Sequence, residues 1–401
     1  MKSARSTLAD CLLSPNLVLS VYCLAAVIAT LVKLAPGSFE QDGFHYQPLQ
    51  NFAIFRNSFY HLIHHQNLYA QFKFEQWDLY RYSPAFALLF APFALLPYAI
   101  GAVLWNLFNA AALFFAVRSM PLLEERRKML ALWFMFLAML NSIENAQSNA
   151  LVAALMIGAW SLQEREKPDA SALCIVAATF VKLFGIFALL PCLLASNETS
   201  RDRKRLLGYT AAWTVVFALM PLFAVSFREI RLLYTNWYAT VHAFNEARLG
   251  ISFMGFLKAW MHINIPSNYM VAVGLTVLVT VAVMGSHARI LVLASVLIFV
   301  TIFNYAAESP SYVIAIAGVA LWYFSQPRTL VNLTLLIATF SLAMVSSTDL
   351  VPRALRREFL EPYVVKALPC ILVWLKLQFD LCVMLKVTHA TGSRRGRRPP
   401  D

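Results

Sequence analysis

The sequence has few charged residues and no alternating strand pattern. Only 13% of its 401 residues are Asp, Glu, Lys or Arg, whereas 60% are hydrophobic. Soluble domains are about one quarter charged and about half apolar, so this composition excludes an ordinary soluble globule, a disordered chain and a disulfide-stapled secreted module. Ten-residue segments of alternating hydrophobicity are absent as well, which excludes a transmembrane β-barrel. The class that remains is an all-α polytopic membrane protein.

Metal-binding spacing is also missing. The six cysteines lie in or beside apolar segments, where they are expected to be small buried side chains. Three histidines, His61, His64 and His65, have helical spacing, but no carboxylate lies among them. No residue pattern requires a metal or a bound cofactor.

Apolar runs of about 17–25 residues, the length of a membrane-spanning helix, recur along the chain. We expect spans at 16–35, 99–117, 129–141, 146–162, 171–196, 207–226, 269–284, 290–303, 311–324, 329–346 and 365–387. Counting 171–196 twice gives about 12 crossings. Residues 1–387 are therefore expected to form a single membrane-embedded domain, followed by a basic, disordered cytoplasmic tail at 388–401.

The net charge of +12 is best explained by an excess of Lys and Arg on the cytoplasmic side of the membrane. Cytoplasmic loops of membrane proteins are enriched in Lys and Arg. Placing both termini and the loops 118–128, 163–170, 197–206, 285–289 and 325–328 in the cytoplasm puts 19 basic residues there and leaves 10 in the opposite loops. Loops 36–82 and 227–268 then face outward, although the last outer loop remains unusually basic. We expect membrane lipids, and no nucleic acid, as partners.

Two apolar segments are too short to cross the membrane as full-length helices. Segment 171–196 lies between two basic loops, so it must enter and return, and each arm reaches only ~20 Å of the ~30 Å hydrocarbon core. It predicts a pair of short helices or a re-entrant hairpin with its apex near Lys182. Segment 83–97 contains Pro84, Pro92 and Pro97, which predict a half-length helix. Broken elements inside a membrane indicate a water-filled cavity.

Polar side chains mark where chemistry could occur. The first outer loop, 36–82, interleaves ionisable and aromatic residues, and apolar positions 52, 55, 59, 62 and 63 predict an amphipathic helix at the interface. Lys182 interrupts an apolar stretch, and Glu308 lies in an outer turn. Between two spans lie five polar groups: Asn141, Glu144, Asn145, Gln147 and Asn149. Ionisable groups at membrane depth usually serve a function.

Three of these segments resemble motifs of glycosyltransferase family 87. The run Tyr82-Ser83-Pro84 through Pro97 resembles the family's Tyr-x-Pro-Pro, leucine-rich and Ala-Pro segment. Asn145-Ala146-Gln147-Ser148-Asn149 resembles its Gly-Gln-x-Asn segment, and Val181-Lys182-Leu183-Phe184-Gly185 matches in part its Leu-Lys-x-x-Pro context. The resemblance covers roughly 40–225. It implies a GT-C fold and an enzyme that uses a polyprenyl-phosphate sugar, often mannose or another hexose, on the outer face of the bacterial inner membrane.

Transfer from such a donor to a lipid or glycan acceptor needs cations at the leaving phosphate and a carboxylate base. We expect Lys182, Arg56 and Arg81 at the phosphate. The sugar or acceptor is expected to meet Asn145, Gln147, Asn149, Tyr82 and Trp77. The family's usual first-loop aspartate is replaced here by Asn51, and Ser83 replaces the first proline of the family's pair. Because an amide is no base, the candidates are Asp78, Asp42 and Glu308, in that order.

Two other functions stay open. A transporter or lipid-handling protein also fits broken helices around a central cation, although no internal repeat is evident. A catalytically inactive scaffold that kept the fold is consistent with Asn51. An assay of sugar release and transfer separates the three.

Overall fold

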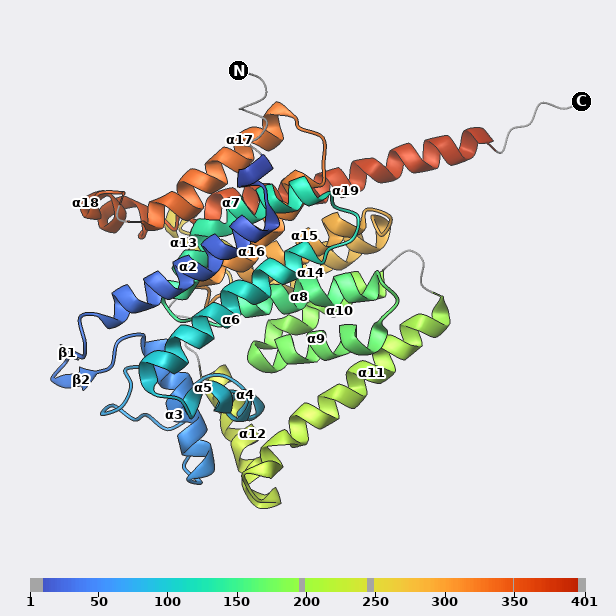
Figure 1. Ribbon diagram of the computed structural model, residues 1–401. Helices are drawn as coiled ribbons and strands as arrows, with labels where there is room; N and C mark the ends of the chain where they lie inside the picture. The colour runs from blue at the N-terminus through green and yellow to red at the C-terminus, as the bar shows by residue number, and fades with distance from the viewer. Residues whose placement is uncertain (1–9, 195–198, 244–248, 349, 396–401) are drawn as a thin grey trace, which may run out of the picture. The chain divides into compact units, whose positions relative to one another are not determined.

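A computed structural model describes residues 10–194, 199–243, 249–348 and 350–395 of the chain (Figure 1). The chain divides into two compact units. Unit 1 comprises residues 1–186 and 202–247, and unit 2 comprises residues 187–201 and 248–401. Each unit is described separately.

Within its described residues, unit 1 is helical apart from one small hairpin in the segment 36–82. Its helices α8 and α9 pack along each other, as do α2 and α6. Its elements are α2 (Pro15–Leu34), β1 (Phe39–Gln41), β2 (Phe44–Tyr46), α3 (Gln50–Ile63), α4 (Pro84–Leu89), α5 (Ala91–Ala94), α6 (Tyr98–Arg118), α7 (Glu125–Glu144), α8 (Asn149–Gln163), α9 (Pro168–Val181), most of η1 (Leu183–Ala188), nearly all of α11 (Ser200–Leu219), η2 (Met220–Phe223) and α12 (Phe227–His242).

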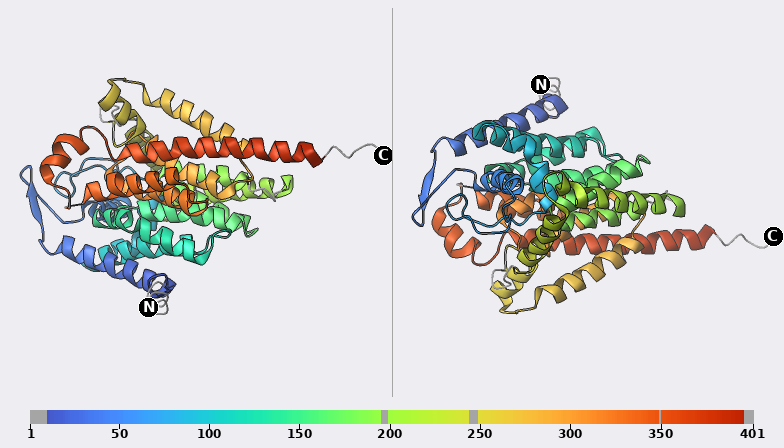
Figure 2. Two further views of the ribbon diagram at one scale, coloured as in Figure 1. Left: turned by 90° about the horizontal axis from the view of Figure 1, so that it is seen from above. Right: turned by 90° about the horizontal axis from the view of Figure 1, so that it is seen from below.

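Unit 2 is built around α15 and α16, whose residues are buried almost throughout. The long helix α19, red in Figure 2, packs against both. The elements of this unit are α10 (Leu189–Leu193), α13 (Phe253–Met261), α14 (Ser267–Met284), α15 (Arg289–Ile302), η3 (Ser309–Ser311), α16 (Tyr312–Phe324), α17 (Leu330–Ala338), η4 (Thr339–Met344), η5 (Val345–Ser347), α18 (Arg353–Leu355), η6 (Arg356–Leu360) and α19 (Ala367–Arg395).

Each predicted span is occupied by helix, and most helix ends lie within a few residues of the predicted ones. Among the described residues, five helical segments are long and apolar enough to cross a membrane: Pro15–Leu34, Tyr98–Arg118, Ser200–Phe223, Ser267–Met284 and Leu330–Ser347. The all-helical, multi-pass class is confirmed, whereas the number of about 12 crossings is not. The single domain over 1–387 stays a prediction. Helix α19 runs to Arg395, and the last residues of the predicted tail, 396–401, lie outside the described part.

The predicted break near Lys182 is present. Helix α9 ends at Val181, and Lys182 has extended backbone angles (φ −142°, ψ 123°) before the 3-10 turn η1 begins. Gly185, at the position of the family's proline, makes this turn possible. Its N–H donates to Lys182 O at 2.7 Å, and a Cβ there would lie 2.4 Å from the backbone of Ala178. Side chains larger than hydrogen are therefore excluded.

The predicted half-length helix is also present, as α4 and α5. Pro84 occupies the first turn of α4, where its missing N–H costs nothing. Pro92 occupies the first turn of α5, so the chain restarts there instead of continuing one long helix. Two short helices thus replace a full span.

The segment 36–82 contains more order than the sequence predicted. The amphipathic helix was expected and is α3. The hairpin β1–β2 was not expected, although Asp42-Gly43 is a typical two-residue hairpin turn and both residues have positive φ (53° and 79°). The loop is held by aromatic contacts, including Phe39 with Trp77 at 6.1 Å between ring centroids.

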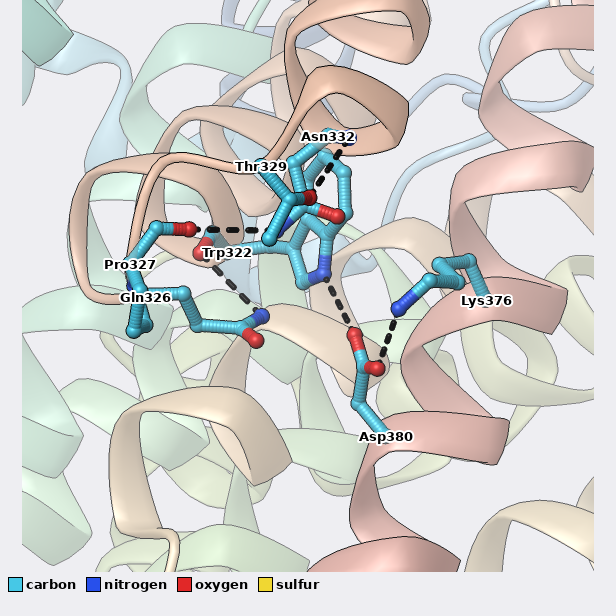
Figure 3. A network of polar contacts seen from close by, with 7 residues as sticks. All are labelled: Trp322, Gln326, Pro327, Thr329, Asn332, Lys376 and Asp380. Carbon is cyan, nitrogen blue, oxygen red and sulfur yellow. Dashed lines mark hydrogen bonds and ion pairs between the residues drawn. The ribbon is translucent and has the colours of Figure 1, made fainter.

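A polar network joins α16 to α19 within unit 2 (Figure 3). Lys376 and Asp380, one turn apart on α19, form an ion pair, and the Trp322 indole N–H donates to Asp380 at 3.4 Å. The Trp322 carbonyl in turn accepts from the Gln326 amide at 3.4 Å. Both charged side chains are less than one third exposed. Each therefore depends on the other for compensation of its charge in an apolar surrounding.

We expect Asp380→Leu to lower the free energy of unfolding by on the order of 3 kcal/mol, because it leaves Lys376 without its counter-charge. The double variant Lys376→Met/Asp380→Leu should recover most of that loss. Thermal unfolding in detergent measures both. Glu124→Leu, which breaks an exposed pair with Arg127, should change stability little. An equal loss in the double variant would contradict the pairing.

The predicted sidedness is testable with two introduced cysteines. Phe74 is 85% exposed in the segment 36–82, and Arg201 is exposed in the first turn of α11, within the predicted cytoplasmic segment 197–206. In a background lacking the native cysteines, a membrane-impermeant thiol reagent applied to intact cells should label Phe74→Cys and spare Arg201→Cys, because the four basic residues of segment 197–206 predict a cytoplasmic position for Arg201. Labelling at position 201 from outside would invert the topology.

Candidate functional site

A cluster of polar side chains surrounds the break at Lys182. The Lys182 ammonium donates to Asn149 Oδ1 at 2.6 Å and lies 5.8 Å from the centre of the Tyr82 ring. The Tyr82 hydroxyl donates to Gln147 Oε1 at 3.2 Å. Three separate sequence motifs therefore meet at one place in unit 1: the segment at Tyr82, the turn before α8, and the break after α9. Four of the predicted site residues belong to this cluster, which we call the Lys182 cluster.

Two buried donors in the Lys182 cluster lack partners within the described part of the chain. Asn149 Nδ2 and Ser148 Oγ are both buried, and neither has a hydrogen-bond partner among the described residues. Native proteins rarely leave such atoms unsatisfied. Because Asn149 gives its Oδ1 to Lys182, its amide hydrogens are directed elsewhere and are available to a ligand.

Ser83, at the start of α4, bonds the last turn of α9 just before the break at Lys182. Its hydroxyl donates to Phe180 O at 2.6 Å, and its Oγ accepts from Phe86 N at 3.1 Å, capping α4. A continued α9 would need the N–H of residue 184 at Phe180 O, and the break at Lys182 removes it. The exchange of the family's proline for serine therefore supplies a hydrogen-bond donor that satisfies a carbonyl at the break.

Asn51, the residue at the family's aspartate position, lies beside the same turn. Its Nδ2 donates to Asn145 O at 2.9 Å. The turn is also held by Trp105, whose indole N–H donates to Ala146 O at 3.0 Å, and Ala146 has positive φ (47°). The amide of Asn51 thus has a positioning contact that a carboxylate could not make, because a carboxylate has no N–H to donate.

The other two predicted cations lie in separate surroundings. Arg56, on α3, stacks over the Tyr60 ring at 5.0 Å and the Tyr98 ring at 6.0 Å. Its Nε is buried without a hydrogen-bond partner among the described residues. Arg81 precedes Tyr82 and binds Asp78 at 2.9 Å, while its carbonyl accepts from the Trp237 indole at 3.1 Å.

The three predicted bases differ in position. Asp78 Oδ1 accepts from Arg81 and from Leu79 N at 2.7 Å, and its side chain is 45% exposed. Asp42 is exposed at the tip of the hairpin. Glu308 belongs to unit 2, where it is exposed and its N–H donates to Ser311 Oγ. Of the three, Asp78 is therefore the one bonded to a residue directly beside Tyr82.

Trp77 and His61 also belong to the segment 36–82 that precedes Tyr82 in the sequence. Trp77 is 48% exposed, and its N–H donates to Gln50 Oε1 at 3.0 Å. His61 bonds Glu75 at 2.9 Å. Burial lowers the pKa of His61, and the Glu75 contact opposes that effect. Within the described residues, no group of three His, Cys, Asp or Glu side chains is arranged to hold a metal.

Sequence reasoning missed part of this site. Glu144, half-buried at the end of α7, directly precedes Asn145. The sequence names it only as one of five polar residues between two spans, whereas the structure places it three residues before Gln147, which bonds Tyr82 of the Lys182 cluster. The roles of Trp105 and Ser83 as hydrogen-bond donors had no sequence signal, because each bonds a carbonyl far away in the chain.

A family model for "Glycosyltransferase family 87" matches residues 80–348, about two thirds of the chain. The chain belongs to glycosyltransferase family 87. This membership confirms the resemblance based on the segments at Tyr82, Gln147 and Lys182. The segments at Tyr82 and Lys182 each form a hydrogen bond with the third segment, through Gln147 and Asn149 respectively.

No curated protein matches the chain. Among solved structures, it is similar to ArnT from Cupriavidus metallidurans bound to undecaprenyl phosphate, with 15% sequence identity and a TM-score of 0.43 over 92% of this chain and 77% of that one.

As a member of family 87 with several long apolar helices, the protein is a multi-pass membrane glycosyltransferase with the predicted all-helical architecture. Its Lys182 cluster joins the family's recognisable segments, so that cluster is the candidate active site.

Proposed function

We propose that the protein transfers a hexose, with mannose as one candidate, from a polyprenyl-phosphate donor to a lipid or glycan acceptor on the outer face of a bacterial inner membrane. The observation that carries this proposal is the contact of Lys182 with Asn149 at a break between apolar helices in a chain of family 87. A cation placed at such a break suits a phosphate that arrives on a lipid. ArnT, a similar structure, is bound to undecaprenyl phosphate.

The proposed reaction displaces the lipid phosphate at the anomeric carbon of the sugar. The acceptor oxygen forms a bond to that carbon, the bond from carbon to phosphate oxygen breaks, and the phosphate leaves with the electron pair. Lys182 stabilises the leaving charge, and Arg56 and Arg81, which lie in separate surroundings, are further candidates for the same role. Asn149 Nδ2, Gln147, Asn145, Tyr82 and Trp77 hold sugar or acceptor hydroxyls.

The acceptor proton requires a base, and Asp78 remains the first candidate. It bonds Arg81, the residue directly before Tyr82, and it follows the exposed ring of Trp77. Asp42 and Glu308 are the second and third candidates. Glu144 joins them, because it precedes Asn145 in the turn that forms the Lys182 cluster.

A second candidate function is a catalytically inactive family member that acts as a scaffold. One observation favours it: Asn51 occupies the family's aspartate position, and its amide is used to hold Asn145. In that case the Lys182 cluster would bind a lipid phosphate without transferring sugar.

The deciding experiment is purification in detergent followed by incubation with a panel of polyprenyl-phosphate sugars. Release of sugar and its transfer to added lipid or glycan acceptors are measured separately. Turnover with one donor supports the transferase. Binding of polyprenyl phosphate without turnover on any donor supports the scaffold.

A further inference from the structure

Unit 2 contains a buried lysine that the proposed reaction does not use. Lys366, directly before α19, is 8% exposed. Its ammonium donates to Ser309 Oγ at 2.7 Å and to Ser347 Oγ at 2.8 Å, and it lies 5.3 Å from the centre of the Tyr312 ring. Within the described residues, no carboxylate lies within ion-pair distance of Lys366.

A positive charge buried in this way has incomplete compensation. Hydroxyl groups and an aromatic ring offer partial negative charge, but they do not neutralise an ammonium. Ionisable groups in membrane proteins that lack a counter-ion commonly face a ligand or an ion. The missing component at Lys366 is therefore an anion.

The hydroxyl groups of Ser309 and Ser347 can bind that anion. The Ser347 Oγ accepts from Lys366 at 2.8 Å and lies 3.5 Å from the Ser309 hydroxyl, so among the described residues its hydrogen can reach an external acceptor. Both serines are only partly buried, and Ser309 follows the exposed Glu308. An anionic oxygen can therefore accept hydrogen bonds from the serine hydroxyls, while the adjacent Lys366 ammonium stabilises its negative charge.

The segment between η5 and Lys366 has the composition of a lipid-contacting surface. Its exposed apolar side chains are Leu350 (80% exposed), Leu355 (49%), Phe359 (43%) and Tyr363 (39%). The exposed Arg353 and Arg357 lie among them. Basic residues interleaved with exposed aromatic and aliphatic ones are typical of segments at the interface with anionic lipid. This also accounts for the unusual positive charge of the last outer loop, which sidedness alone leaves unexplained.

We propose that Lys366, Ser309 and Ser347 bind the phosphate group of a membrane lipid whose hydrocarbon chain runs along residues 350–363. This site lies in unit 2 and shares no residue with the Lys182 cluster. It therefore goes beyond the proposed transfer reaction and does not depend on turnover.

The test measures lipid binding by the full-length protein in detergent, in a Lys182→Met background that removes the other proposed phosphate contact. The probes are undecaprenyl phosphate, phosphatidylglycerol and inorganic phosphate, and apparent affinity is read from thermal stabilisation and from lipid retention in native mass spectrometry. Lys366→Met should weaken binding of a phosphorylated lipid about tenfold or more, the effect of losing one charge-assisted hydrogen bond. Lys258→Met, at an exposed lysine of the same unit, should leave it unchanged.

Two results would overturn the proposal: unaltered lipid binding by Lys366→Met, or inorganic phosphate binding as tightly as either lipid. If Lys366→Met fails to fold, the variant Ser309→Ala/Ser347→Ala keeps the charge and should still bind several-fold more weakly, while unchanged affinity would refute the site. The lipid that binds more tightly identifies the source of the phosphate. Because binding is measured without sugar transfer, failure of this site and failure of the transferase proposal give different results.

Discussion

Lys182→Met is expected to abolish sugar transfer, by at least ~10²-fold in kcat, while the protein stays folded. Lys182 is the charged group of the Lys182 cluster, and it is held at the helix break by Asn149. Removing it takes away the cation that stabilises the leaving phosphate. Methionine fills a similar volume, so the packing around Tyr82 should survive. Transfer is measured at saturating donor, with thermal unfolding recorded in parallel.

The matched control is Lys167→Met. Lys167 is exposed at the other end of the same helix, where it is the residue before Pro168. This variant should retain full activity. If Lys182→Met instead unfolds at a higher temperature and keeps its activity, Lys182 is only a tolerated buried charge, and the phosphate must bind elsewhere.

A loss of similar size is expected when the base is removed. The series Asp78→Asn, Asp42→Asn and Glu308→Gln, assayed at equal expression, should contain one variant that loses at least ~10²-fold in transfer rate. Asp78→Asn is the first candidate, because Asp78 bonds Arg81 beside the Lys182 cluster. The amide keeps the shape of the side chain and removes its ability to accept a proton.

Asp169→Asn provides the control for this series, since Asp169 is exposed in the first turn of α9. It should be silent. Full activity in all three variants would reject the assignment and direct attention to Glu144→Gln. A wild-type protein that transfers no sugar from any donor would favour the scaffold.

Much of the fold could be predicted because it depends on local properties. Helix positions follow from the length of apolar runs, which is why the predicted span 269–284 lies within α14 (Ser267–Met284). The break at Lys182 followed from a length argument, since 26 residues cannot cross the membrane twice. The turn at Asp42-Gly43 is also a local signal, but the predicted amphipathic helix rests on positions 52 to 63 alone, so no element was expected at residues 39–46.

The parts that could not be predicted depend on contacts between distant residues. Asn51 looks like a lost catalytic group in the sequence, whereas the structure shows its amide bonded to Asn145, 94 positions away. Lys366 lies at the edge of an apolar run, and only the fold brings Ser309 and Ser347 to its ammonium. The sequence likewise places Asp78, Asp42 and Glu308 in outer loops without indicating which one approaches the Lys182 cluster.

The bond from Ser83 to Phe180 has a consequence for biosynthesis. The two residues are 97 positions apart, so the short helix α4 leaves the ribosome long before its partner does. Until α9 has been made and inserted, the Ser83 hydroxyl cannot reach the Phe180 carbonyl, and the segment at Tyr82 has no Lys182 to meet. The Lys182 cluster can therefore form only after residue 182 has been made, which is before the middle of the 401-residue chain, and nascent chains that end before residue 180 contain the segment at Tyr82 without its partners.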